Sequence, residues 1–393
     1  MATSFEKFKM LEERGVKALE LMRQKAFKPN KEKTLRNWSI TDVSKIVKKT
    51  TQCIRVCEKE GKLPSPKIDN KSKRFYTLSD INKIRDYFGI LPRKGDRVAP
   101  AVIAFTNFKG GVAKTTSALH AAQYFAKSGY RVLMIDTDSQ ASTTSCFGYA
   151  PDEDISNQKT LLDFFTGKNK KFASLITKTY WDNLDLIPAN LGLYGVELEL
   201  PLVLSRAIDE GTPFKIHNIL QTGIQQVCDQ YDVVIIDCPP SLSILNTNAL
   251  FAATALVIPV PPELPDIASM VQFFGMIRGT LGKFPKKQYS FIRVLITKND
   301  GSDSSKRITS TLRALYGNYI MKAEMFTTQV IKKARTEMCS VYELQKYKGA
   351  QQTLNRAIQI VNNINEEIES LVWQSWGESS RPYKAKTMEK EVV

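Results

Sequence analysis

The chain has 393 residues, of which 42% are hydrophobic and 24% are charged, and its formal net charge is +16. This length allows two or three domains with a core large enough to need no disulfides, so we interpret the six scattered cysteines as reduced thiols. No run of about 18 apolar residues occurs, and the amino-terminal stretch MATSFEKFKM has no apolar core. We therefore expect a cytoplasmic protein that is neither secreted nor membrane-spanning.

The positive charge is concentrated towards the amino terminus. Residues 1–100 contain 25 Lys and Arg against 12 Asp and Glu, which leaves only +3 of the net charge to the rest of the chain. An asymmetry of this size indicates an anionic partner for the amino-terminal part, although a basic surface that only keeps the protein soluble is the alternative. We expect this partner to be nucleic acid.

The first predicted element is a helix over residues 5–27. Its apolar side chains recur at near-helical spacing, with an interruption at Gly15. Because the helix has one apolar stripe, that stripe needs a cover, which either a second subunit or the next domain would supply. We assign residues 1–35 to this helix, with dimerisation as one of its two candidate roles.

Residues 36–92 form the next predicted unit. The spacing predicts short helices over 42–48 and 51–60 with a tight turn between them, then a basic, turn-rich segment, then a helix with Thr77 or Ser79 as its N-cap. Two short helices across a tight turn, followed by a basic hairpin, are typical of a winged helix-turn-helix DNA-binding domain. The segment resembles the DNA-binding unit of MerR-like regulators at Arg74, Tyr76, Asp80, Ile81 and Ile84.

The second short helix is the candidate recognition helix. Polar side chains near its start would face base edges, and basic side chains in the hairpin would contact phosphate. The candidates for base contact are Thr51, Gln52 and Arg55, and those for phosphate contact are Lys73 and Arg74. A solvated basic face is the alternative interpretation for each of them.

Beyond a linker over residues 93–100, the sequence changes character. Continuous apolar runs alternate with helical stretches, and strands without in-and-out alternation are buried on both faces. The expected strands cover 101–107, 131–136, 185–189, 232–237, 255–260 and 291–298, and the later helices cover 303–316, 328–338 and 349–374. We therefore predict an α/β domain over residues 101–376, a mostly parallel sheet flanked by helices, and a polar tail over residues 377–393.

The stretch FTNFKGGVAKTTSALH, residues 105–120, joins the first predicted strand of this domain to a helix. Backbone N–H groups at the start of a helix, left open by glycines, are suited to hold phosphate oxygens. The usual pattern, G-x-x-x-x-G-K-[ST], would have glycine where Phe108 and Ala113 stand. The predicted nucleotide-binding residues are Gly110, Gly111, Val112, Ala113, Lys114, Thr115 and Thr116. Among them, Lys114 would reach the β- and γ-phosphates and Thr115 would bind Mg²⁺.

The displaced glycines follow a second lysine, Lys109, and the resulting pattern K-G-G-x-x-K-[ST] resembles the deviant Walker A motif of the ParA/MinD family of ATPases. The resemblance implies a P-loop NTPase fold, ATP and ADP as ligands together with Mg²⁺, and a homodimer. It also implies that Lys109 crosses the dimer interface to the nucleotide held by the other subunit. A cation that reaches the γ-phosphate only from a second subunit would couple dimerisation to ATP.

A second stretch, RVLMIDTDSQAS at residues 131–142, resembles the family motif that follows the second strand. Asp138 matches the carboxylate that orients the attacking water, and Asp136 lies beside the metal region. Ser139 stands where the family usually has proline, so this loop is expected to be less rigid. The resemblance therefore gives Lys109, Lys114 and Asp138 as the catalytic residues.

Later stretches extend the match. In YDVVIIDCPPSLS, residues 231–243, Asp237 would hold Mg²⁺ through a water molecule, because Mg²⁺ prefers carboxylate and water oxygens. Thr115, Asp136 and Asp237 are thus the candidate metal residues. In LITKND, residues 295–300, the resemblance is to the segment whose Asn or Asp reads adenine, which gives Asn299 as a candidate for base binding.

The layout of the whole chain resembles the longer ParA-type partition proteins, in which a helix and a winged helix-turn-helix precede the ATPase domain. The resemblance implies an ATP-bound dimer that binds DNA nonspecifically on the nucleoid. It also implies hydrolysis stimulated by a centromere-bound ParB-like partner, and repression of the protein's own operon by operator binding. Nonspecific DNA contact is expected at Lys332, Lys333 and Arg335 in a carboxyl-terminal helix.

Three alternatives share parts of this pattern. A MinD-like membrane-positioning ATPase would end in a basic amphipathic helix, whereas the last predicted helix has acidic residues opposite its apolar face; we expect it to cover the core and expect no membrane contact. A nitrogenase-type iron protein would need cluster-binding cysteines, for which Cys146 and Cys238 are weak candidates. A nucleotide-regulated repressor without a role in segregation would share the DNA-binding domain.

Overall fold

The computed structural model of the chain describes residues 4–26, 33–68, 74–95, 98–209, 216–282, 287–344 and 350–377. Its centre is a seven-stranded sheet with the strand order β5-β6-β4-β7-β3-β8-β9. The strands are β3 (Ala101–Phe105), β4 (Val132–Asp136), β5 (Thr177–Lys178), β6 (Leu184–Ile187), β7 (Val233–Asp237), β8 (Ala255–Val260) and β9 (Phe291–Ile296). All neighbouring pairs are parallel except β5 with β6, so the predicted mostly parallel sheet is confirmed.

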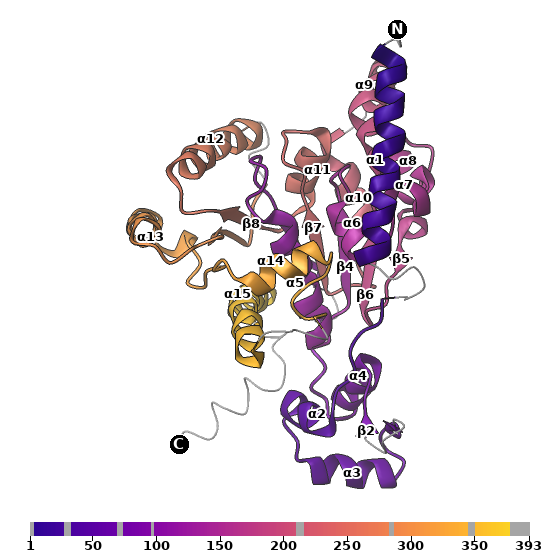
Figure 1. Cartoon of the computed structure of the whole chain (residues 1–393), viewed down its shortest axis with the longest axis vertical. Helices are drawn as coiled ribbons and strands as arrows, with labels where there is room; N and C mark the ends of the chain where they lie inside the picture. Colours follow the sequence, from indigo (N-terminus) through magenta and orange to yellow (C-terminus); the bar gives the residue numbers. More distant parts are fainter. Residues whose placement is uncertain are drawn as a thin grey trace.

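Helices cover both faces of the sheet (Figure 1). In β3, Ile103 and Phe105 belong to one hydrophobic cluster and Val102 and Ala104 to the other, which explains why this strand shows no alternation in sequence. The first cluster includes α5 (Lys114–Ser128), α14 (Gln329–Thr336) and α15 (Gln351–Trp376). The second includes α8 (Leu161–Phe165), α9 (Gly195–Asp209), α10 (Ile219–Gln225), α11 (Ile244–Ala252), α12 (Leu264–Leu281) and α13 (Asp303–Tyr316). Two short helices, α6 (Ser142–Cys146) and α7 (Pro151–Asp154), follow β4.

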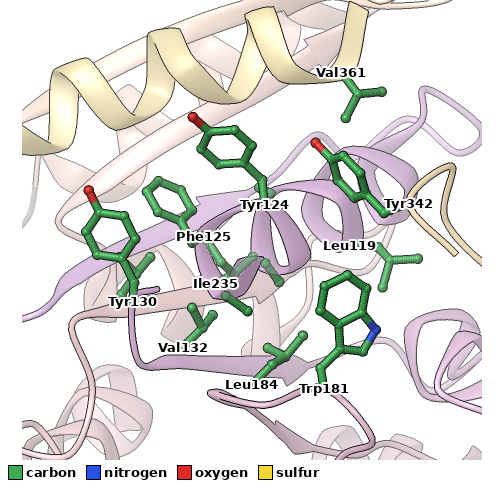
Figure 2. Packing of buried hydrophobic residues seen from close by; sticks show 14 of the residues in the cluster. Leu119, Tyr124, Phe125, Tyr130, Val132, Trp181, Leu184, Ile235, Tyr342 and Val361 are labelled. Carbon is green, nitrogen blue, oxygen red and sulfur yellow. The ribbon is translucent and has the colours of Figure 1, made fainter. Parts of the chain in front are cut away.

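The last helix, α15, packs against α5, which lies between it and the sheet (Figure 2). The phenol groups of Tyr124 and Tyr130 donate hydrogen bonds to Glu369, at 2.8 and 2.6 Å. The apolar face of α15 is thus buried, which confirms that this helix covers the core. Within the described ranges, no helix is long and apolar enough to cross a membrane.

The amino-terminal unit contains α2 (Ile40–Val47), α3 (Thr51–Lys59), a hairpin of β1 (Lys67–Ile68) and β2 (Arg74–Phe75), and α4 (Leu78–Tyr87). Figure 1 shows α2, α3 and α4 gathered at one end of the molecule. Local chemistry fixes the start of each helix: Ser39, Thr50 and Thr77 are the N-caps of α2, α3 and α4. Of the two caps considered for α4, Thr77 is the one used. The backbone N–H of Ser79 instead donates to Asp182 of the sheet domain, at 2.9 Å.

The first helix, α1 (Ser4–Ala26), is continuous through Gly15. Its apolar side chains Phe5 and Phe8 are 78% and 72% exposed. The next domain therefore does not cover this part of the stripe in the single chain, which leaves a second subunit as the remaining candidate of the two considered.

Candidate nucleotide-binding site

The carboxyl ends of β3, β7 and β4 meet at one edge of the sheet, and the loop after β3 lies above them. Asp136 and Asp237 are paired in register at the ends of β4 and β7. A cavity of about 500 Å³ lies at this edge, and its lining includes Lys114, Thr115 and Asp138. This arrangement is the one expected of parallel strands, whose carboxyl ends hold the ligands of α/β proteins. The edge therefore brings together most of the residues predicted for nucleotide and metal binding.

The loop that precedes α5 has an unusual backbone. Gly111 has a φ of 75°, and Ala113, which stands where the usual pattern has glycine, has a φ of 72°. Both lie in the left-handed region, which disfavours a side chain by about 1 kcal/mol or more. Gly110 and Gly111 are exposed, whereas Val112 is buried beneath them. Ala113 thus adopts a backbone conformation that favours glycine, at the position where the usual motif has glycine.

This strain predicts opposite effects for two substitutions. Ala113→Gly is expected to raise the free energy of unfolding by up to about 1 kcal/mol, because glycine adopts a positive φ without the clash. Gly111→Ala is expected to lower it by about 1 kcal/mol, although an added Cβ would meet no atom within 4 Å. Urea denaturation of the nucleotide-free proteins measures both. Changes of the same sign would show that backbone strain does not decide the effect.

Hydrogen bonds to β8 and to the end of β9 hold the loop in place. The amide of Asn107 donates to the carbonyl of Pro259 at 2.9 Å, and its oxygen accepts from the backbone N–H of Lys109 at 3.0 Å. The hydroxyl of Thr297 donates to the carbonyl of Val112 at 3.0 Å. The loop is therefore fixed from β8 and β9 as well as from β3, which favours a phosphate site formed before the nucleotide arrives.

The two lysines of the loop point to different partners. Lys114 is 6% exposed, and its ammonium group donates to the carbonyl of Lys109 at 2.9 Å. Burial lowers the pKa of Lys114, which nearby carboxylates only partly oppose. The ammonium of Lys109 lies 2.9 Å from Asp266 of the same chain. In the single chain, Lys114 thus lines the cavity while Lys109 is paired with a carboxylate at the start of α12.

Asp237 is the residue best suited to a divalent cation. One carboxylate oxygen accepts from the hydroxyl of Thr143 at 2.8 Å, whereas the other is buried and has no hydrogen-bond partner among the described residues. Burial raises the pKa of Asp237 to about 6, and hydroxyls of Thr143 and Thr115 lower it in part. A buried carboxylate oxygen without a hydrogen-bond partner, next to a threonine hydroxyl, is suited to bind Mg²⁺ together with its water ligands. No group of three His, Cys, Asp or Glu in the described ranges could hold a metal, so phosphate oxygens would have to complete the shell.

The carboxylate of Asp136, unlike that of Asp237, accepts hydrogen bonds at both of its oxygens. One of its oxygens accepts from both the backbone N–H and the hydroxyl of Thr144, at 3.0 and 2.8 Å, and the other accepts from the backbone N–H of Asp138 at 3.2 Å. Burial, with the charge of Asp237 as the next cause, raises the pKa of Asp136 to about 8. Because protein donors already occupy both oxygens, Asp136 is better suited to position Asp138 and α6 than to bind the metal.

A second cavity, of about 760 Å³, lies on the β9 side of the loop, and its lining includes Lys298, Asp300 and Phe326. Asn299, the predicted base contact, is buried and is not among the lining residues. Its oxygen accepts from the backbone N–H of Gly301, and its amide donates to Glu324. The backbone N–H of Ser302 and the hydroxyl of Ser305 hold the pKa of Asp300 at about 2. The geometry therefore favours Lys298 and Asp300 over Asn299 for contact with a base.

The candidate DNA contacts fall into two places. On α3, Gln52 and Arg55 are exposed and Thr51 is half-buried. In the hairpin, Arg74 is paired with Glu58 of α3 at 2.7 Å, so it joins the hairpin to that helix; Lys73 lies outside the described residues. On α14, Lys332 and Arg335 line the second cavity, and Lys333 is paired with Glu337 at 3.5 Å. The three basic residues of α14 are thus not equivalent.

Sequence reasoning missed the residues that hold the two buried carboxylates. Thr143 and Thr144, on α6, are fully buried and bind Asp237 and Asp136. The signal available was the run of hydroxyl residues STTS, residues 142–145, at the end of the second motif and at a helix start, where such residues usually serve as caps. Asp266, the partner of Lys109, lies in the stretch VIPVPPELPD, which gave no sign of a charge pair.

Comparison with known proteins identifies the family of the chain. A family model described as an AAA domain matches residues 100–284. The chain is 32% identical to a putative replication protein A of Sinorhizobium fredii (strain NBRC 101917 / NGR234), over 92% of each protein. It is 30% identical to the chromosome partitioning protein ParA of Caulobacter vibrioides (strain NA1000 / CB15N), over 66% of this chain and 94% of that protein. A solved structure of a partition protein shares the fold, with a TM-score of 0.66 and 20% identity over 94% of this chain and 99% of that one. The chain belongs to the ParA-type partition ATPases.

Proposed function

We propose that this chain hydrolyses ATP and uses the nucleotide cycle to control its binding to DNA during segregation. The observation that carries the proposal is the sheet edge at which the buried cation of Lys114 and the half-buried Asp138 line one cavity, while Asp237, at the end of β7, has a buried carboxylate oxygen without a hydrogen-bond partner among the described residues. These are the parts that phosphoryl transfer requires, namely a cation for the phosphates, a carboxylate for the metal and a carboxylate near the attacking water.

Each residue has a separate task in this proposal. Lys114 and the exposed backbone N–H groups of the loop hold the phosphates, and Thr115 and Asp237 hold Mg²⁺, which neutralises charge on the β- and γ-phosphates. One oxygen of Asp138 accepts from the backbone N–H of Gln140 at 2.9 Å, which fixes the carboxylate at the cavity. Asp138 then orients the attacking water, a role that needs position more than basicity.

Dimerisation depends on Lys109 in this scheme. To reach the nucleotide of a second subunit, Lys109 must leave Asp266, which is 5% exposed. Leaving a buried carboxylate without its cation costs about 3 kcal/mol, so the exchange is favourable only when the partner's triphosphate replaces Asp266 as the anion. The exposed apolar stripe of α1, with Phe5 and Phe8, supplies a second contact between the subunits.

DNA binding is proposed at both ends of the chain. The α2–α4 unit, with α3 as its recognition helix, binds an operator, and through it the protein represses its own operon. The basic residues of α14 contribute to nonspecific binding of DNA on the nucleoid by the ATP-bound dimer. A ParB-like protein bound at a centromere stimulates hydrolysis and so releases the dimer. The net charge of +16 and its concentration in residues 1–100 support an anionic partner.

Asp138→Ala tests this cycle, since it removes the proposed water-orienting group and leaves the phosphate site intact. The variant is expected to bind ATP within about threefold of the wild type, to lose hydrolysis by at least about 100-fold, and to remain dimeric on DNA. Light scattering with ATP and Mg²⁺ measures the dimer, and fluorescence anisotropy with nonspecific duplex measures DNA affinity. That affinity is expected to require ATP and to fall steeply between 50 and 200 mM salt, as counterion release predicts for roughly six or more phosphate contacts.

Two outcomes would contradict the proposal. If the Asp138→Ala protein stays monomeric with ATP and Mg²⁺, dimerisation does not depend on the nucleotide. If the DNA affinity changes with neither salt nor nucleotide, the nucleotide does not control DNA binding. That result would favour a repressor that acts without the cycle.

A further inference from the structure

Helix α14 lies over the nucleotide site, at the boundary between its two cavities. The cavity of about 500 Å³ includes Lys114 and Asp138, and the cavity of about 760 Å³ includes Lys298 and Asp300. The residues that line both cavities are Ala113, Thr116, Ile331 and Arg335. Arg335 therefore stands where the phosphate end of the site meets the base end, across from the first turn of α5.

The packing of α14 fixes which side chains face these cavities. Val330 and Ala334 are buried against the core, and the hydroxyl of Thr328 accepts from the backbone N–H of Ile331 at 3.1 Å. Ile331 and Arg335 are four residues apart and so share one face of the helix. With the helix anchored from its cap and from its buried side, this face is held towards the cavities rather than free to turn away.

The basic side chains of α14 differ in their ion pairs and in the cavities that they line. In the described part of the chain, neither Lys332 nor Arg335 forms an ion pair, whereas Lys333 is paired with Glu337 at 3.5 Å and does not line either cavity. The acidic groups lining the cavities are Asp138 at the phosphate end and Glu263 and Asp300 at the base end. Arg335 at the boundary and Lys332 in the larger cavity, both without an ion pair among the described residues, leave a site for an anion.

We propose that Arg335, with Lys332 beside it, binds the phosphates of the nucleotide, and that Lys333 does not. The inference rests on the proposed function, because it takes a nucleotide as the ligand of the loop. Arg335 and Thr116 both line the two cavities, so Arg335 serves ADP as well as ATP. Its guanidinium is suited to this task, since it stays charged and forms paired hydrogen bonds with phosphate oxygens. DNA offers the same phosphate groups, so an experiment has to distinguish binding of nucleotide from binding of DNA.

Binding of ATP and ADP to the full-length protein, with Mg²⁺ and without DNA, separates them. Arg335→Ala is expected to weaken both nucleotides by about 10-fold or more, and Lys332→Ala by a smaller factor. Arg335→Lys is expected to recover part of the loss, because it keeps the charge and loses the paired geometry. Lys333→Ala is the matched control on the same helix and is expected to stay within about twofold of the wild type. Thermal unfolding of each variant without nucleotide checks that the fold is retained.

The proposal is overturned if Arg335→Ala binds both nucleotides as the wild type does, whether or not it loses affinity for DNA. It is also overturned if Lys333→Ala weakens nucleotide binding as much as Arg335→Ala, which would indicate a general effect of charge. Lys114→Ala, measured alongside, distinguishes this failure from failure of the proposed function: nucleotide affinity lost in Lys114→Ala but kept in Arg335→Ala would reject only the role of α14.

Discussion

Lys114→Ala is expected to weaken ATP binding by about 100-fold or more. A hydrogen bond to a charged group contributes about 1.5–3 kcal/mol, and a lysine that reaches two phosphates makes more than one, so about 3 kcal/mol of binding free energy is lost. The ammonium already lies 2.9 Å from the carbonyl of Lys109, within the loop, so the protein holds it near the phosphate site before ATP arrives. Isothermal titration with ATP and Mg²⁺ measures the loss. An affinity equal to that of the wild type would show that the loop is not the phosphate site.

Lys109→Ala is the control for this prediction, because it removes a cation from the same loop that is 35% exposed and paired with Asp266. This variant is expected to bind ATP within about fivefold of the wild type when the protein is dilute and monomeric. Its defect is expected in ATP-dependent dimerisation, which light scattering detects. Equal losses of nucleotide affinity in the two variants would place both lysines on the same nucleotide and remove the argument for a crossing cation.

The meeting of the three motifs at one edge of the sheet could be predicted from sequence because each motif is local. The loop, the D-x-D stretch and the D-x-P-P stretch each follow a buried strand, and parallel strands bring their carboxyl ends to one edge without further information. The side-chain partners could not be predicted in this way. Lys109 with Asp266, and Arg74 with Glu58, are separated along the chain and depend on how helices pack.

The loop after β9, which lines the larger cavity, shows the same limit for single residues. The stretch TKND was correctly placed at the end of a strand, yet Asn299 turns its amide towards Glu324 while Lys298 and Asp300 line the cavity. Lys298 has a φ of 52°, in the left-handed region of the backbone. This conformation is uncommon in residues other than glycine, and the sequence does not predict it here. A shift of one position along an irregular loop reverses which side chain lines the cavity.

Helix α5 connects the two ends of the molecule that the proposed cycle has to couple. It begins with Lys114 at the phosphate site and ends at Gly129, where an added Cβ would lie 3.1 Å from Leu91 and 3.1 Å from Pro92 of the segment after α4. Arg93 of that segment donates to the carbonyl of Gly129 at 2.5 Å. A displacement of α5 on nucleotide binding would therefore reach the α2–α4 unit through direct contact. Because the helix is packed between the sheet and α15, such a displacement would be of the helix as a whole.

Asp237→Asn is expected to stabilise the nucleotide-free protein at pH 8 while impairing its binding of Mg²⁺ and ATP. The pKa of Asp237 is about 6 in the folded chain, above its ordinary value of 3.8, because burial disfavours the charged form. A raised pKa contributes stability that is present below pH 4 and is lost as the pH rises through 6. At pH 8 the wild type therefore contains a buried carboxylate with one oxygen unpaired, and replacing it with a neutral amide is expected to raise the free energy of unfolding by about 2 kcal/mol.

Urea denaturation at pH 4 and pH 8 measures this effect, with a difference between variant and wild type expected only at pH 8. Asp138→Asn is the matched control, because Asp138 lies half-buried at the same edge, and its replacement is expected to change the free energy of unfolding by less than about 0.5 kcal/mol at either pH. Saturating ATP and Mg²⁺ should reverse the order at pH 8, since only the wild type gains the full stabilisation from its ligand. A nucleotide-free Asp237→Asn protein that is less stable than the wild type at pH 8 would show that this carboxylate supports the fold instead of being held ready for a cation.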